Sequence, residues 1–223
     1  MASGITFWLL TTIVIAAIAV PAYLLLSKAR ARRNAHSFTK ALSRAHAILT
    51  ALEPIPDAMI QRDLRRGLVL LLNDHLRVLA GQNPEHPHLL YLQSQVARLN
   101  RIPNGFQRTG LRCKQARRDA SSGFTELAGL IKAGMNERAI DQRNGSLAHA
   151  SAICAAQQID VEMARQAAFD AEHMRAYPQA LDFAYQAQVL CRKLPPMMRE
   201  KLTQAVTDDI ERLKNLGSAP AKT

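Results

Sequence analysis

The sequence predicts an all-α protein in which one N-terminal transmembrane helix precedes a soluble helical bundle. A run of residues near the N-terminus carries no charge. Apolar residues then recur every three or four positions along most of the chain, which is the spacing of amphipathic helices. Aromatic residues make up only 5% of the sequence, and β-branched residues are sparse outside the uncharged run, so no segment indicates a β-strand.

The uncharged run extends from Ile5 to Leu26. As a helix, its about 22 residues span roughly 33 Å, enough to cross a hydrocarbon core of roughly 30 Å. Four cations follow at once: Lys28, Arg30, Arg32 and Arg33. They favour an N-terminus outside and a C-terminal domain in the cytoplasm, as at a bacterial inner membrane. A cleaved signal peptide, suggested by Ala17-Ile18-Ala19, is the weaker alternative because its charges would precede the apolar run.

The net charge of +11 is divided unevenly along the chain. Residues 28–118 contain 17 lysines and arginines against 5 acidic residues, whereas residues 119–223 contain 12 against 13. The positive excess therefore lies in the first half, next to the predicted membrane helix. Such an asymmetry indicates an anionic partner, either lipid head groups or nucleic acid.

Helix boundaries are predicted from prolines, glycines and capping residues. We expect the membrane helix to continue to Leu52 and to end at Pro54 and Pro56, with Asp57 as the N-cap of the next helix. A turn over 83–87 and a shorter helix to residue 102 follow. A weaker helical pattern covers 109–143, and Asn144-Gly145-Ser146 is predicted to break it.

The predicted organisation has six parts. They are a short tail (1–4), the transmembrane helix (5–26), a basic juxtamembrane helix (27–53), a basic helical region (54–145), an Ala-rich hairpin plus terminal helix (146–217) and a disordered tail (218–223).

The C-terminal hairpin resembles a tetratricopeptide repeat over residues 160–195. Ala168, Tyr177, Ala180 and Ala187 match the small and aromatic positions of that repeat, although the closing Pro195 comes about three residues late. The resemblance implies a concave surface that binds a protein segment. It names these partner-binding candidates: Tyr177, Ala180, Leu181, Ala184 and Tyr185. An ordinary Ala-rich helical hairpin is the alternative.

Cations are the candidates for binding anionic lipid or phosphate, because the guanidinium fork can bind two phosphate oxygens at once. No acidic residue occurs between His86 and Arg118. The candidates are Lys28, Arg30, Arg32, Arg33, Arg98, Arg101, Arg108, Arg112, Lys114, Arg117 and Arg118. A solvated helix face is the plain alternative. Nucleic acid ranks below lipid because few aromatic residues lie among these cations.

No catalytic motif is recognisable, so we expect a protein that is not an enzyme. Three widely spaced cysteines without a CxxC pair and histidines that stand singly on predicted helices indicate neither a metal site nor a cofactor. The sequence therefore predicts a single-pass, membrane-anchored adaptor or scaffold that binds a protein partner on the cytoplasmic side. The alternative is a membrane-tethered nucleic-acid-binding protein using Arg98–Arg118. An oligomer is compatible with either function.

Overall fold

The computed structural model describes residues 26–29, 32–102, 111 and 113–218. Every regular element in these ranges is helical, which confirms the predicted all-α bundle. Residues 26–29 and 32–52 are helical and come first. They are followed by η1 (Asp57–Met59), α2 (Arg62–Gln82), α3 (Pro87–Arg101), α4 (Lys114–Asn136), α5 (Gln142–His173), α6 (Tyr177–Cys191) and α7 (Pro196–Ser218).

The predicted fold class is wrong in its transmembrane part. None of the helices in the described ranges is both long and apolar enough to cross a bilayer. The expected span, residues 5–26, lies outside the described residues except for Leu26. The helix over 32–52, which was expected to continue that span, instead buries Ala45, Ile48 and Ala51 in a protein core. The corrected fold class is an all-helical bundle.

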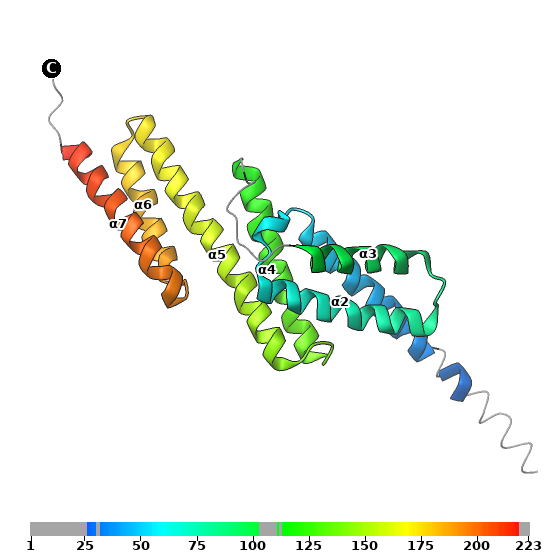
Figure 1. The fold of residues 1–223 in the computed structure, drawn as a ribbon. Helices are drawn as coiled ribbons and strands as arrows, with labels where there is room; N and C mark the ends of the chain where they lie inside the picture. Colours follow the sequence, from blue (N-terminus) through cyan, green and yellow to red (C-terminus); the bar gives the residue numbers. More distant parts are fainter. Residues whose placement is uncertain (1–25, 30–31, 103–110, 112, 219–223) are drawn as a thin grey trace, which may run out of the picture.

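Helix α5 is a 32-residue spine of roughly 48 Å, shared by two groups of helices. Figure 1 shows α2 and α4 crossing its N-terminal half and α6 and α7 running along its C-terminal half. Ala152 and Ile159 of α5 belong to the first hydrophobic core, with residues from the 32–52 helix, α2, α3 and α4. Val161 and Ala168 of α5 belong to the second core, with α6 and α7. The molecule is therefore elongated along α5.

Helices α2 and α5 approach closely in the first core. A Cβ atom added to Gly67 would lie 2.3 Å from the Cβ of Ala148, closer than two carbon atoms can pack. Gly67 and Ala148 are both fully enclosed, so neither helix can move away without opening the core. The small residues at this crossing set the distance between the two helices.

The predicted start of the second helix is wrong, because Asp57 begins the short η1 helix and α2 begins only at Arg62. The burial of Ile55, Met59 and Ile60 holds this connection against the core, so the chain turns once more before α2. The side chain of Asp57, the predicted N-cap, instead forms an ion pair with a residue of α3.

The predicted break at residues 144–146 is also wrong, because these residues form the first turn of α5. Asp141 is the N-cap, and its carboxylate accepts hydrogen bonds from the Asn144 backbone N–H (2.9 Å) and the Asn144 side-chain amide (2.7 Å). Gly145 lies where an added Cβ would be 2.3 Å from Cγ of Met135, so the glycine serves close packing rather than a turn. The break falls instead at Glu137–Asp141.

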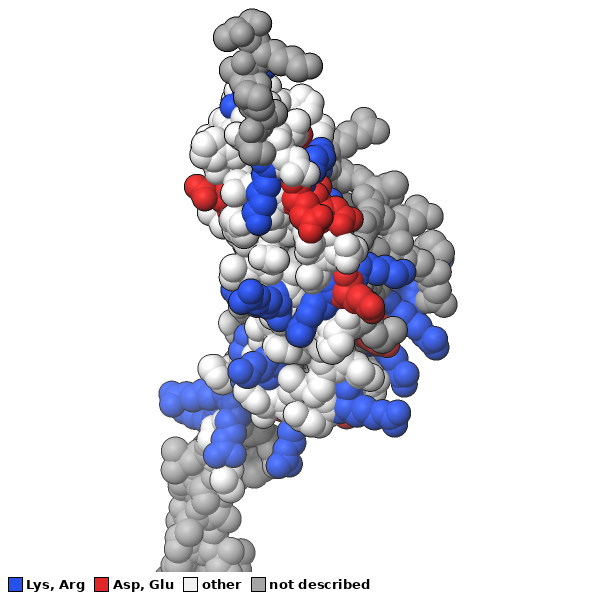
Figure 2. All heavy atoms as spheres, turned by 90° about the vertical axis from the view of Figure 1, so that its left-hand side faces the viewer, with Lys and Arg blue, Asp and Glu red and all other residues white. Residues whose placement is uncertain are grey.

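The uneven charge along the sequence is also visible on the surface. In Figure 2, Lys and Arg side chains dominate the part nearer the N-terminal helices, whereas acidic side chains gather over the opposite end among a few cations. Two cations of the 32–52 helix, Lys40 and Arg44, are each 3.1 Å from Oε1 of Glu137 at the end of α4. The remaining basic surface is largely open to solvent on this side.

We expect two glycines of α2 to respond oppositely to alanine. Gly67→Ala should destabilise the protein by about 1–3 kcal/mol because the methyl group overpacks the contact with Ala148. Gly81→Ala should stabilise it by up to about 1 kcal/mol, because among the described residues no atom beyond its own stretch of helix lies within 4 Å of the added Cβ, and alanine favours the helix. Urea unfolding of the two variants measures both changes. Equal stabilisation by both would contradict the close approach.

We expect His75 to make the protein less stable in mild acid. This side chain on α2 is only 6% exposed, and its burial lowers its pKa below the ordinary value; Arg44 and Lys40 add to this, while Asp74 and Glu137 oppose it. The unfolded chain then binds the proton more tightly, so stability is full above about pH 6.5 and falls as the pH drops below that value.

His75→Gln should remove part of this loss between pH 7 and pH 5, as measured by urea midpoints at each pH. The matched control is His173→Gln, at an exposed position. The same pH dependence in His75→Gln and in the unmodified protein would show that burial of His75 has no such effect.

Candidate functional site

A groove runs along α5 between the first turn of α4 and helix α7. It consists of a cavity of about 410 Å³ between α5 and α7, one of about 300 Å³ next to α4, and a smaller one of about 40 Å³ at Gln158. Arg117 lines all three cavities, so they adjoin one another at its side chain. We call the three together the α5 groove, and its main residues are Lys114, Arg117, Gln158, Glu162, Met163, Arg165, Gln166, Phe169, Asp170, Asp209, Arg212 and Leu213.

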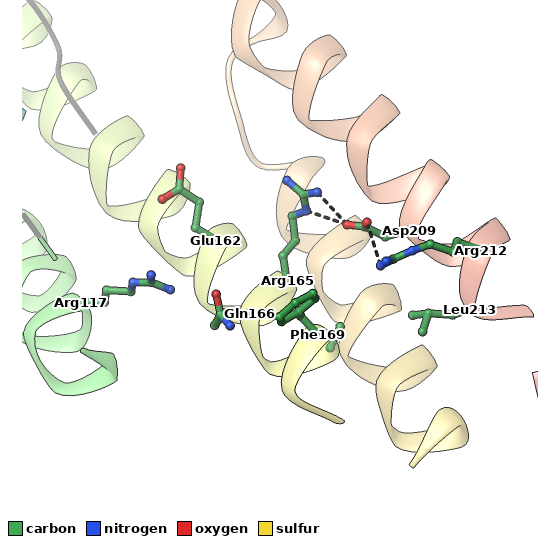
Figure 3. Close-up of a pocket in the computed structure, with 9 residues that line it drawn as sticks. Arg117, Glu162, Arg165, Gln166, Phe169, Asp209, Arg212 and Leu213 are labelled. Atoms are coloured by element: carbon green, nitrogen blue, oxygen red, sulfur yellow. Dashed lines mark hydrogen bonds and ion pairs between the residues drawn. The ribbon is translucent and has the colours of Figure 1, made fainter. Parts of the chain in front are cut away.

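Ion pairs hold the α7 side of the groove to α5. Both Nε and an Nη of Arg165 lie 2.8 Å from Oδ2 of Asp209. Arg212 lies 3.4 Å from the other oxygen of Asp209 and 3.0 Å from Oε2 of Glu172. Figure 3 shows Asp209 between the two guanidinium groups. Arg165, Asp209 and Glu172 are partly buried and Arg212 is 48% exposed, and the shared carboxylates orient both arginines.

The α4 side of the groove is positively charged. The first turns of α4 carry Lys114, Arg117 and Arg118 with no acidic residue in the first turn, although the helix dipole there favours negative charge. Nε of Arg117 donates to the carbonyl of Leu111 at 3.2 Å. In Figure 3 its guanidinium group extends from α4 towards α5. Lys114 and Arg117 form no ion pair with any residue that the structure describes.

A buried amide lies at the inner end of the groove. Gln158 on α5 is 4% exposed, and its Oε1 accepts no hydrogen bond from any residue that the structure describes. It lines the cavity of about 40 Å³ together with Arg117 and Glu162. A polar cavity of this size can hold a water molecule or one polar group of a ligand. Buried amides are normally hydrogen-bonded. The cavity has room for a group that would donate a hydrogen bond to Gln158.

An aromatic side chain provides an apolar contact in the groove. Phe169 on α5 is 46% exposed, with its ring centroid 4.1 Å from that of His173 one turn later. Nδ1 of His173 is 3.1 Å from the carbonyl of Phe169, which holds this pair together. Leu213 of α7 lines the same cavity. The groove therefore combines an exposed ring with fixed charges.

The structure separates the cations predicted to bind anions. Lys114 and Arg117 lie in the α5 groove, whereas Arg98 on α3 is bound in a bidentate ion pair by Asp57 and contacts Gln95. Five further members are solvent-exposed and do not line the groove: Lys28, Arg32, Arg33, Arg101 and Arg118. The members outside the described residues are Arg30, Arg108 and Arg112. The sequence run is therefore not one continuous cationic ridge in the described part of the fold.

The residues predicted to bind a partner through the hairpin are mostly used inside the second core. Ala180 and Ala184 are buried there, and Leu181 packs against it. Tyr177 is half-buried, and Tyr185 is exposed with Nζ of Lys214 5.9 Å from its ring centroid. The small residues of α6 thus serve helix packing, and the open surface in this region lies along α5 instead.

Sequence reasoning missed Arg165, Phe169, Asp209 and Arg212. Arg165 and Asp209 are 44 residues apart on different helices, and no local spacing relates them. The single signal in the sequence was one turn of α7 in which Asp209 and Arg212 are three residues apart. The groove could be found only once α5 and α7 were placed side by side.

Metal-binding and thiol chemistry have little support in the residues described. No group of three or more His, Cys, Asp or Glu side chains among them could hold a metal ion. Burial raises the pKa of the Cys154 and Cys191 thiols, so both stay protonated near neutral pH. Sγ of Cys113 accepts a hydrogen bond from the Ala116 backbone N–H as the N-cap of α4.

No protein-family model, curated protein or solved structure matches this chain. The resemblance of residues 160–195 to a tetratricopeptide repeat therefore stays a prediction. The function of the α5 groove has to be argued from its own residues.

We expect Asp209→Asn to destabilise the protein by about 1 kcal/mol, because it removes the carboxylate that pairs with Arg165 and leaves Arg212 with Glu172 alone. The neighbouring Asp208→Asn should change stability by less than about 0.5 kcal/mol, because Asp208 is exposed and accepts a hydrogen bond from the side chain of Gln204 on the same helix. Urea unfolding in low and high salt compares the two. An equal effect of both substitutions would mean that the network does not stabilise the fold.

Proposed function

We propose that the protein is a helical adaptor that binds a segment of a partner protein in the α5 groove. The observation that carries this proposal is the groove itself, where fixed arginines and an exposed phenylalanine line adjoining cavities along α5. Arginine and aromatic side chains are enriched among the residues that contribute most binding energy in protein interfaces.

Rigidity of the groove supports the same function. Asp209 and Glu172 orient Arg165 and Arg212 before any ligand arrives, so little side-chain entropy is lost on binding. Phe169 adds apolar area that a partner side chain can cover. An open channel of two adjoining cavities fits an extended or helical segment better than an enclosed small substrate.

This proposal keeps the adaptor function expected from the sequence but moves the binding surface from α6 to α5. Ala180 and Ala184 are committed to the second core, so they cannot also contact a partner without unfolding it. Binding of anionic lipid or nucleic acid by the exposed cations, the cytoplasmic location and the absence of catalysis stay predictions.

Photo-crosslinking in the cells that make the protein tests the adaptor function. The full chain carries benzoylphenylalanine at position 169 in one variant and at position 189 in another. Phe169 in the groove and Val189 on α6 are 46% and 54% exposed, so the two probes are comparably accessible. We expect the probe at 169 to give discrete crosslinked protein species that the probe at 189 does not give.

A second change gives the specificity control. Arg165→Gln in the background of the 169 probe should reduce the crosslinked species severalfold, because it loosens the bonds to Asp209 that shape the groove. Crosslinks that are equal at 169 and 189, or none at 169, would contradict a groove that binds a partner segment.

A further inference from the structure

We infer that the segment accepted by the α5 groove is acidic, and that a carboxylate side chain of the partner binds Lys114 and Arg117 at the start of α4. This inference rests on the proposed function, since it names the chemistry of the partner of the same groove. It is carried by the charge balance of the groove and by the buried amide of Gln158.

The acids of the groove are already bound within the chain. Asp209 binds two arginines, and Glu172 pairs with one of them. Oδ1 of Asp170 accepts from the side-chain amide of Gln166 at 2.9 Å. Glu162 also has an interaction partner. Lys114 and Arg117, in contrast, have no carboxylate partner among the residues described, so the α4 end of the groove has a positive surplus.

The backbone at this end favours the same ligand. The first N–H groups of α4 have no partner inside the helix, and their dipoles attract negative charge. Cations in the first turns of α4 are unfavourable for the helix, because the dipole at that end is positive. An anion bound between the cations and the helix end offsets this repulsion. A carboxylate bound there would interact favourably with both. The Arg117 guanidinium uses Nε for the Leu111 carbonyl, which leaves its two terminal nitrogens to bind two carboxylate oxygens.

Gln158 points independently to a polar ligand. Its side chain is buried, its Oε1 lacks a partner among the residues described, and it lines the cavity that Arg117 also lines. The oxygen and nitrogen of an amide can exchange places by rotation, so the same side chain can donate to a carboxylate held by Arg117 or bind it through one water. A water molecule between Gln158 and the bound carboxylate would donate to both and so supply the hydrogen bond that Oε1 lacks.

The flanks of the groove argue for a peptide rather than a nucleic acid. A polyphosphate chain along α5 would pass Asp170, whose carboxylate accepts from the neutral amide of Gln166, and would be repelled there. A peptide needs negative charge only at the α4 end and can place an apolar side chain on Phe169. The distribution of charge therefore selects an acidic segment that also carries an apolar residue.

A random twelve-residue peptide library displayed on phage and selected on the full chain tests this inference. We expect the enriched peptides to contain Asp or Glu, and the best of them, made synthetically with a fluorophore, to bind in a polarisation assay. Arg117→Gln should weaken that binding by about tenfold or more, because it removes a charge-assisted, bidentate contact. A peptide with Gln and Asn in place of its acids should lose as much.

Arg118→Gln is the matched control, because it removes the same charge from the next position, which is exposed and does not line the groove. It should change the affinity by less than about twofold at physiological salt, where surface charges are screened. Circular dichroism confirms that both variants fold. Equal weakening by the two substitutions would overturn the inference, because the attraction would then be a general surface charge.

Two other outcomes separate this inference from the proposed function. Enrichment of neutral or basic peptides whose binding is lost in Phe169→Ala would overturn the acidic chemistry and leave the adaptor function standing. Peptides insensitive to both Phe169→Ala and Arg117→Gln would overturn both. A twelve-nucleotide RNA that binds more tightly than the best peptide, and loses binding in Arg117→Gln, would assign the groove to nucleic acid instead.

Discussion

Helix α5 contributes buried residues to both hydrophobic cores. The positions of the other helices follow from covering these residues. Six of the twelve buried residues of α5 are alanines, which allow close approach but provide little apolar area each. The larger side chains therefore come from the partners, such as Leu68 and Phe124 in the first core and Leu213 in the second. Small residues on the shared helix and large ones around it are the constraint under which this fold is built.

The groove is a direct result of that arrangement. Helix α4 ends its contact with α5 in the first bundle, and α7 begins its contact in the second, so a length of α5 lies open between them. Polar residues occupy this open length: Arg165 pairs with Asp209 of α7 and Glu172 with Arg212 of α7, while Arg117 projects from α4. The groove is thus formed by the same helices, α4, α5 and α7, that build the two cores.

The all-helical class and several boundaries could be predicted from the sequence because prolines and apolar spacing act locally; Pro87 and Pro196 do begin helices. The ends of α4 and α5 depend on backbone conformations that the residue types do not indicate. Arg138 and Arg175 follow α4 and α5 with φ near +60°, in the left-handed region where glycine is expected. The groove could not be predicted at all, because it joins residues of α4, α5 and α7 through tertiary packing alone.

The shared helix also ties the geometry of the groove to the number of residues between the two cores. One residue inserted near Asp160, where the cores meet on α5, would turn the second bundle by about 100° relative to α4 and carry Gln166 away from Arg117. Seven inserted residues would restore the facing sides to within about 20° but move them about 10 Å apart along the axis. Length variation within α5 would thus preserve both cores while abolishing the groove between them.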